Sequence, residues 1–79
     1  MKDRDFTWDA NNLDKIAKHG VSCEEAEHVV RFARRPYPRH HRKGTWIVLG
    51  HGNSDRKLQV IFVIDEYDNI YVIRAMPVR

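Results

Sequence analysis

The stretch TWIVLGHGNSDRKLQVIFVIDEYDNIYVIRAM (residues 45–76) carries the strongest signal for the architecture of this chain. It contains three runs, TWIVLGH, KLQVIFVID and IYVIRAM, that are rich in the β-branched and aromatic residues typical of strands. The runs are separated by GNSD and EYDN, whose residues favour turns. This pattern predicts an antiparallel meander of three strands. The middle run is apolar on both faces, so we expect it to be the central strand.

Upstream of the meander, the stretch KHGVSCEEAEHVV (residues 18–30) predicts the joint between two helices. Gly20 can end the first helix because glycine adopts the left-handed conformation without strain. Ser22 and Glu25 have the spacing of a capping box at the start of the second helix. Since its neighbours have these structural roles, we interpret Cys23 as a small, half-buried residue and not as a nucleophile.

The predicted element order is β-α-α-β-β-β, with FTW (residues 6–8) as a short first strand. This order predicts an α+β fold in which two helices pack on one face of an antiparallel sheet. We expect a single domain over residues 1–79, because a chain of this length is close to the minimum that one core can stabilise. One cysteine cannot form an intrachain disulfide, so packing or a partner must stabilise the fold.

The composition also favours a cytoplasmic protein without a membrane partner. The start of the chain, MKDRDFTWD, lacks the apolar region of a secretory signal, and no apolar run approaches the roughly 18 residues of a membrane span. No CxxC pair is present, and Cys23 and His28 do not share a helical face. We therefore predict neither a metal site nor a cofactor.

Positive charge is concentrated in the middle of the chain. Residues 28–54 contain six Lys or Arg side chains and no Asp or Glu, whereas residues 1–27 have an excess of acid. Basic side chains that alternate with Tyr37, His40, His41 and Trp46 are typical of a surface for single-stranded RNA. The candidate contact residues are Arg34, Arg35, Arg39, His40, His41, Arg42 and Lys43. A solvated connector without fixed contacts has the same composition.

The candidate catalytic residues lie on the predicted meander. RNA cleavage without a metal needs a base for the 2′-hydroxyl, cations for the charge on the phosphoryl oxygens, and an acid for the leaving 5′-oxygen. Histidine can be the base or the acid, and Lys and Arg supply charge. We therefore predict His51 as base or acid, with Lys57 and Arg74 as the stabilising cations.

The stretch FTWDANNLDKIAKHGVSCEEAEHVV (residues 6–30) resembles the N-terminal signature of the BrnT family of type II toxin–antitoxin toxins. The resemblance lies in its Phe-x-Trp-Asp start, a helix ending in Lys-His-Gly-Val-Ser and a Glu-Glu-Ala second helix, and the three C-terminal strands fit the same pattern. It implies a RelE-like fold and an endoribonuclease that slows growth by cutting RNA. It also implies a cognate antitoxin that masks the toxin and helps it repress its own promoter. Promoter DNA would then be contacted only indirectly, through the antitoxin complex, and the basic segment would bind RNA or the antitoxin.

The resemblance has departures at the candidate site. BrnT-like proteins carry Gly-Arg at the end of the first meander strand, where this chain has Gly50-His51. They carry an Arg where this chain has Lys57, and Ser-Ala-Arg where it has Arg74-Ala75-Met76. We therefore expect a different substrate or efficiency, or a weakened member of the family.

Two other functions fit the basic 31–43 segment. The first is a nucleic-acid-binding module without catalysis, which would bind RNA with a steep salt dependence and leave it intact. The second is a protein-interaction module that docks an acidic partner, which would retain no nucleic acid at physiological salt.

Overall fold

The computed structural model describes residues 4–52 and 55–78, and these form two helices and a five-stranded sheet. The elements, in chain order, are β1 (Phe6–Thr7), α1 (Ala10–Ala17), α2 (Cys23–Arg31), β2 (Arg39–His40), β3 (Trp46–His51), β4 (Lys57–Ile64) and β5 (Ile70–Pro77). The predicted α+β class and the three-stranded meander are confirmed. The predicted GNSD turn includes residues 53 and 54, which lie outside the described residues.

The sheet differs from the prediction in two ways. Its strand order is β1-β5-β4-β3-β2, and β1 runs parallel to β5, so the sheet is mixed and not antiparallel throughout. The first and the last strand of the described chain are therefore neighbours at one end of the sheet and run in the same direction. The second difference is the additional strand β2, which pairs with Trp46 and Ile47 at the outer edge of β3.

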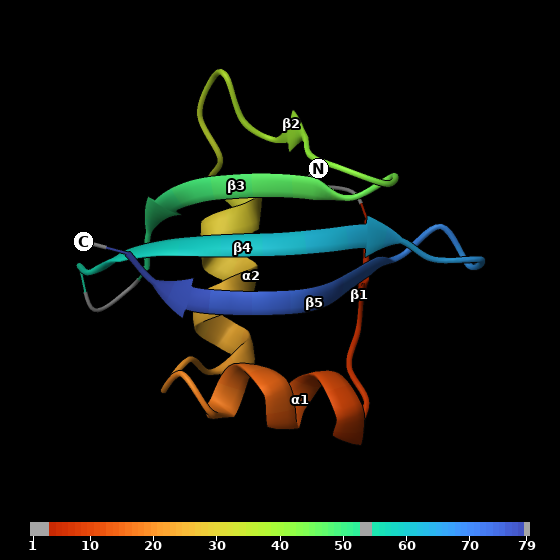
Figure 1. The fold of residues 1–79 in the computed structure, drawn as a ribbon, viewed down its shortest axis with the longest axis horizontal. Coiled ribbons are helices and arrows are strands. Elements are labelled where there is room, and N and C mark those ends of the chain that lie inside the picture. The colour runs from red at the N-terminus through yellow and green to blue at the C-terminus, as the bar shows by residue number, and fades with distance from the viewer. Residues whose placement is uncertain (1–3, 53–54, 79) are drawn as a thin grey trace.

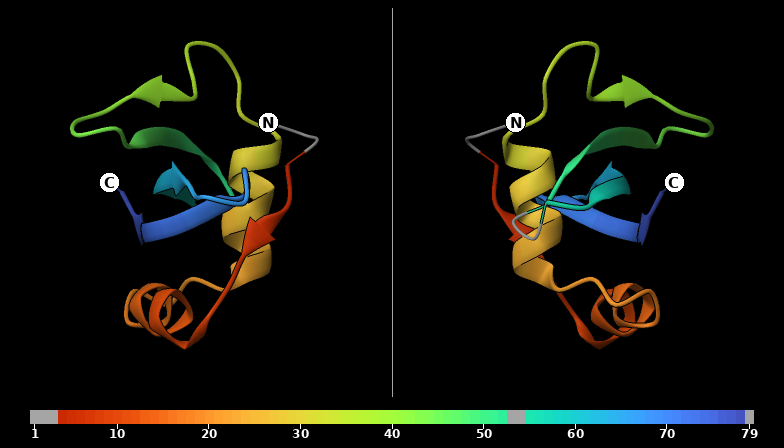
Figure 2. Two further views of the ribbon diagram at one scale, coloured as in Figure 1. Left: turned by 90° about the vertical axis from the view of Figure 1, so that its right-hand side faces the viewer. Right: turned by 90° about the vertical axis from the view of Figure 1, so that its left-hand side faces the viewer.

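The helices do not share one face, which corrects the predicted packing. Figures 1 and 2 show α2 crossing the back of the sheet, whereas α1 lies beside β5, roughly parallel to it, at the sheet edge. The physical reason is the narrow buried stripe of α1, in which Ile16 is buried while Leu13 is 39% exposed. Such a stripe can seal an edge but cannot cover a face. Neither helix combines the length and hydropathy that crossing a membrane requires, as far as the chain is described.

The predicted joint between the helices is present. Asp9 caps α1, since its carboxylate accepts the amide of Asn12 at 3.0 Å. Gly20 has φ of 72°, the left-handed conformation expected after a helix end. The Ser22 hydroxyl accepts the amide of Glu25 at 3.1 Å, as a capping residue should. The Glu25 carboxylate has a different partner, Arg56.

The core lies between α2 and the sheet. Three residues of α2, Ala26, Val29 and Val30, are 0–2% exposed. They pack in one cluster with the buried strand residues Val48, Leu58, Val60, Phe62, Ile70, Val72 and Ala75. Because side chains alternate along a strand, the residues between these point to the opposite side of the sheet.

That opposite side, which we call the open face, has no helix across it (Figure 1). It carries the alternate residues of β3, β4 and β5, namely Ile47, Leu49, His51, Lys57, Gln59, Ile61, Val63, Tyr71, Ile73, Arg74 and Met76. None of these residues is a carboxylate, and three can carry positive charge. The sheet therefore presents an apolar surface with basic side chains on the side away from α2.

Candidate functional site

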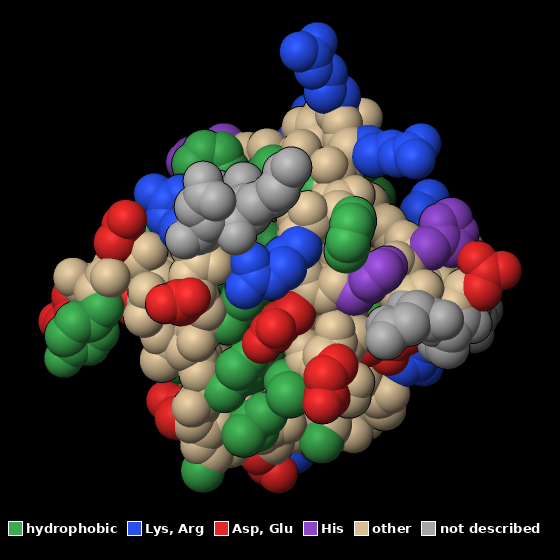
Figure 3. All heavy atoms as spheres, turned by 180° about the vertical axis from the view of Figure 1, so that it is seen from behind, with side chains coloured by type: hydrophobic (Ala, Val, Ile, Leu, Met, Phe, Trp, Pro, Cys, Tyr) green, Lys and Arg blue, Asp and Glu red, His purple; other side chains and the backbone are tan. Residues whose placement is uncertain are grey.

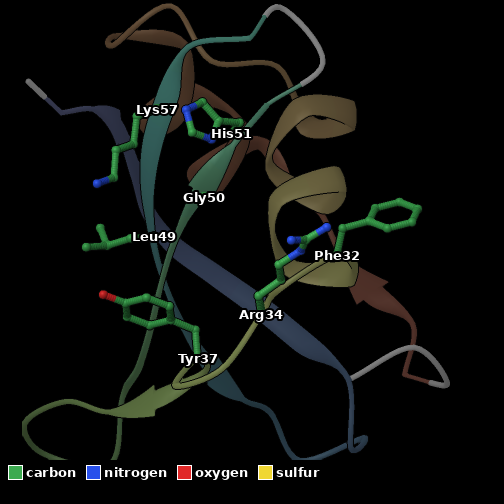
Figure 4. Close-up of a pocket in the computed structure, with 7 residues that line it drawn as sticks. All are labelled: Phe32, Arg34, Tyr37, Leu49, Gly50, His51 and Lys57. Carbon is green, nitrogen blue, oxygen red and sulfur yellow. The ribbon is translucent and has the colours of Figure 1, made fainter.

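A hollow of about 430 Å³ lies at the end of β3 and contains two of the three predicted catalytic residues. We call it the His51 hollow, and it is lined by Phe32, Arg34, Tyr37, Leu49, Gly50, His51 and Lys57. Figure 4 shows that these residues come from the end of β3, the start of β4 and the segment after α2. The structure thus brings part of the arginine-rich segment next to the meander.

His51 and Lys57 are direct cross-strand partners at the end of the β3–β4 pair. Residues so paired have Cβ atoms roughly 5 Å apart, so both side chains can reach one bound group. Both residues are exposed. Solvent and a substrate therefore have direct access to the imidazole and the ammonium group.

The His51 hollow follows the edge of β3. β2 pairs with Trp46 and Ile47 of β3, so residues Val48–His51 of β3 lie beyond the end of β2. In Figure 4, Lys57, Leu49 and Tyr37 extend to one side of β3, and Arg34 lies on the other side, next to α2. A ligand in the hollow would contact groups from both sides of this edge.

Arg34 and Tyr37 reach the hollow because the chain turns directly after α2. The amide of Tyr37 donates to the carbonyl of Arg34 at 2.9 Å, which closes the turn. The Tyr37 ring is partly buried and packs against the core, so its position is fixed by packing. Arg34 is exposed at the other end of this turn.

A salt bridge fixes the β3–β4 hairpin on the N-terminal turn of α2. Arg56 donates to both carboxylate oxygens of Glu25, at 3.1 and 2.8 Å, and also to the carbonyl of Gly20. The hydrogen bonds to Glu25 raise the pKa of Arg56 above its usual value. This contact ties Arg56, the residue before Lys57, to α2.

A second hollow, of about 360 Å³, lies on the open face and contains the third predicted catalytic residue, Arg74. We call it the Arg42 hollow, and it is lined by Lys15, His41, Arg42, Lys43, Thr45, Ile61, Ile73 and Arg74. Its side chains come from α1, the turn between β2 and β3, and strands β4 and β5. The predicted catalytic set is therefore divided between two hollows.

The turn beside this hollow is held by its own hydrogen bonds. The amide of His41 donates to the carbonyl of Thr45 at 2.8 Å. The amide and hydroxyl of Thr45 donate to the carbonyl of Arg42 at 3.1 and 2.7 Å. Lys43 and Gly44 have φ of 55° and 76°, the left-handed region that a tight turn uses. The basic residues of this turn thus have a defined backbone.

The other predicted contact residues lie along the same segment. Arg34 belongs to the His51 hollow, and His41, Arg42 and Lys43 belong to the Arg42 hollow. Arg35, Arg39 and His40 are exposed and line neither hollow. The His40 ring packs edge-on against Trp46, with ring centroids 5.3 Å apart.

Eight residues that line the two hollows were not among the predicted site residues, and two of them, Tyr37 and Lys15, have a titratable side chain. Tyr37 is one of several aromatic residues in the basic segment, and its place in the His51 hollow depends on the turn after α2. Lys15 is on α1, far from the basic segment in sequence, and no local pattern connects it with Arg42. Both positions result from tertiary packing.

In residues 4–52 and 55–78, no three His, Cys, Asp or Glu side chains are grouped as metal ligands. Burial, followed by the nearby Glu24 carboxylate, raises the pKa of the Cys23 thiol. A raised pKa disfavours the thiolate, in agreement with a structural role for Cys23.

Charge is distributed unequally between the two sides of the molecule. Seen from behind, the face that contains α2 has Asp and Glu side chains across its middle and lower parts, and Lys and Arg mainly in its upper half (Figure 3). The strand residues of the open face, in contrast, carry no carboxylate. An anionic ligand is therefore favoured on the open face.

Comparisons of the chain with protein-family models, with curated proteins and with solved structures gave no match.

Proposed function

We propose that the protein is the toxin of a type II toxin–antitoxin system, a cytoplasmic, metal-independent endoribonuclease that cuts RNA at the His51 hollow. The observation that carries this proposal is the cross-strand pair of His51 and Lys57 in one hollow with Arg34 and Tyr37. In this proposal the fold is RelE-like and the chain is a BrnT-type toxin, as the N-terminal stretch suggests.

In this proposal, residues that line the hollow take each role that the reaction needs. The 2′-oxygen forms a bond to phosphorus while the bond to the 5′-oxygen breaks, which leaves a 2′,3′-cyclic phosphate and a free 5′-hydroxyl. His51 takes the proton of the 2′-hydroxyl as general base, and the Tyr37 hydroxyl donates a proton to the leaving oxygen. Lys57 and Arg34 stabilise the charge that builds on the phosphoryl oxygens.

The proposed antitoxin would neutralise the enzyme by covering the open face. This face has apolar strand residues such as Ile47 and Leu49, with Lys57 and Arg74 among them. An apolar centre with charged residues around it is the usual make-up of a protein interface. Promoter DNA would be bound by the complex through the antitoxin.

Alanine substitution in the hollow tests the proposal. We expect His51→Ala to slow cleavage of single-stranded RNA by about 10²–10⁴-fold, the usual range for a general acid or base. We expect Lys57→Ala to slow it by about 10²–10³-fold through loss of charge stabilisation. His19→Ala and Lys18→Ala are the matched controls, because both residues are exposed and lie near the end of α1, outside the hollow.

Rates would be measured with purified protein on labelled RNA, with circular dichroism to verify folding. Growth arrest on expression without antitoxin should be relieved by the two hollow variants and kept by the two controls. Equal rates in hollow and control variants would place the reaction elsewhere. RNA binding without cleavage by the wild type would favour the non-catalytic binding module.

A further inference from the structure

The Arg42 hollow places four uncompensated cations around an apolar floor. The cations are Lys15, Arg42, Lys43 and Arg74, and the floor is formed by Ile61 and Ile73. In the part of the chain that the structure describes, none of these four cations takes part in an ion pair. Their charge is therefore free to attract an anion.

An irregularity in β5 creates this combination of charged and apolar groups. Ile61 of β4 pairs with Arg74, but the next residue, Phe62, pairs with Val72, so Ile73 is an extra residue on β5. Such a β-bulge places two residues opposite one. Ile73 and Arg74 both line the hollow as a result, although strict alternation would put them on opposite faces.

A nucleotide of a single strand matches this chemistry better than an inorganic anion does. Lys and Arg side chains bind phosphate oxygens, and an apolar floor suits the flat face of an unpaired base. A duplex keeps its bases stacked inside the helix, so only its phosphates could be used here. The floor therefore favours a strand whose bases are free.

The spacing of the two hollows suits one continuous strand. Lys57 lies in the His51 hollow and Ile61 in the Arg42 hollow, and they are on the same strand and the same face. Four residues of a strand span about 13 Å. At ~3.4 Å per stacked nucleotide this distance corresponds to about four nucleotides, and to fewer in an extended strand.

We infer that the Arg42 hollow is a second RNA subsite, which binds a nucleotide two to four positions away from the bond that is cut in the His51 hollow. Arg42, Lys43 and Lys15 contact phosphates, and a base lies on Ile61 and Ile73. Arg74 then has a binding role and not a catalytic one. The inference rests on the proposed function for the identity of the other hollow.

Binding of uncleavable RNA as a function of length tests the subsite. Single strands with 2′-O-methyl groups cannot react through the 2′-oxygen, so fluorescence anisotropy would report binding alone. We expect the affinity to rise by about tenfold or more when the strand is lengthened from about two to about six nucleotides. Only the longer strand reaches both hollows, and its contact with the second hollow then forms within one complex. The double variant Arg42→Ala, Lys43→Ala should lose this rise, and Lys18→Ala should keep it.

Two further measurements separate phosphate contacts from base contacts. The double variant should reduce the slope of log K against log salt by about 1.4, because each phosphate that a cation neutralises on a single strand contributes ~0.7 to the slope. Ile73→Thr should weaken binding without changing that slope, because it removes apolar surface and no charge. Annealing a complementary strand should remove the advantage of length in the wild type.

The inference is wrong if the double variant keeps the rise with length, or if it loses no more affinity than Lys18→Ala. Cleavage of unmodified RNA by the wild type is measured separately. Absence of cleavage would refute the proposed function, whereas the length dependence would still decide whether the second subsite exists.

Discussion

Among single residues, Gly52 shows how closely the chain directly after β3 packs on α2. A Cβ atom at this position would lie 2.6 Å from Cγ and 2.9 Å from Cδ of Glu25. These separations are too short for carbon atoms, so any larger residue would displace the carboxylate that holds Arg56. Glycine is needed here for space and not for its backbone conformation.

This close approach predicts a non-additive pair of substitutions. Gly52→Ala should lower the free energy of unfolding by about 1–3 kcal/mol, the usual cost of overpacking. In a Glu25→Ala background the same substitution should cost less, because the clashing atoms are gone, with a coupling of about 0.5–3 kcal/mol. Urea denaturation of the wild type, the two single variants and the double variant measures this coupling. Additive effects on the free energy of unfolding would show that the two residues do not clash.

At the scale of elements, the turn between β2 and β3 positions Arg42 and Lys43. Gly44 in this turn has φ of 76°, and Gly20 at the end of α1 has φ of 72°. A Cβ atom would meet nothing within 4 Å at either position. The two glycines are therefore matched in backbone strain and in surrounding space, and differ only in location.

Replacing each glycine by alanine separates stability from binding. Both Gly44→Ala and Gly20→Ala should destabilise the fold by about 1–2 kcal/mol, because L-residues are disfavoured in the left-handed region. Only Gly44→Ala should also weaken binding of single-stranded RNA, since a strained turn displaces Arg42 and Lys43. Thermal denaturation and fluorescence anisotropy would be compared, and equal reductions in affinity would indicate a general effect of instability.

The elements also show how far the sequence predicts the fold. The meander and the joint between the helices were predictable because strand composition, turn residues and caps are local signals. Strand β2 was not, because Arg39 and His40 are a two-residue strand without apolar alternation. The position of α1 at the sheet edge, and the parallel pairing of β1, depend on contacts between distant segments.

The candidate site was predictable to a similar extent. The pairing of His51 with Lys57 follows from the meander, since both residues flank its first turn. The separation of Arg74 from that pair depends on register, which composition does not specify. The presence of Arg34 beside His51, and of Lys15 beside Arg42, results from long-range packing that no local pattern encodes.

At the scale of the whole molecule, the distribution of charge matters more than its sum. A formal net charge of +3 is modest, but the open face contains Lys57 and Arg74 without a carboxylate among its strand residues. Arg4 and Lys18, in contrast, form ion pairs with Asp68 and Asp14. Neutralising Lys57 and Arg74, or neutralising Arg4 and Lys18, removes the same amount of positive charge from two different places on the molecule.

We expect the double variant Lys57→Gln, Arg74→Gln to weaken RNA binding. It should also reduce the slope of log K against log salt by about 1.4, because each phosphate that a cation neutralises contributes ~0.7 to this slope. Arg4→Gln, Lys18→Gln should leave the affinity and the slope nearly unchanged, since these side chains lie outside both hollows. The dissociation constant would be measured over a series of salt concentrations. Equal weakening in both variants would mean that binding follows total charge and that the open face has no special role.

The pairing of β1 with β5 has a consequence for how the protein is made. β1 is synthesised before the other strands of the sheet, but its neighbour in the sheet, β5, is the last strand of the described chain. Thr7 also donates a hydrogen bond to Asp65, which directly follows β4. A nascent chain on the ribosome thus cannot complete its sheet until translation has passed β5, so the proposed RNA-cutting surface would assemble only after the part of the messenger that encodes this sheet has been read.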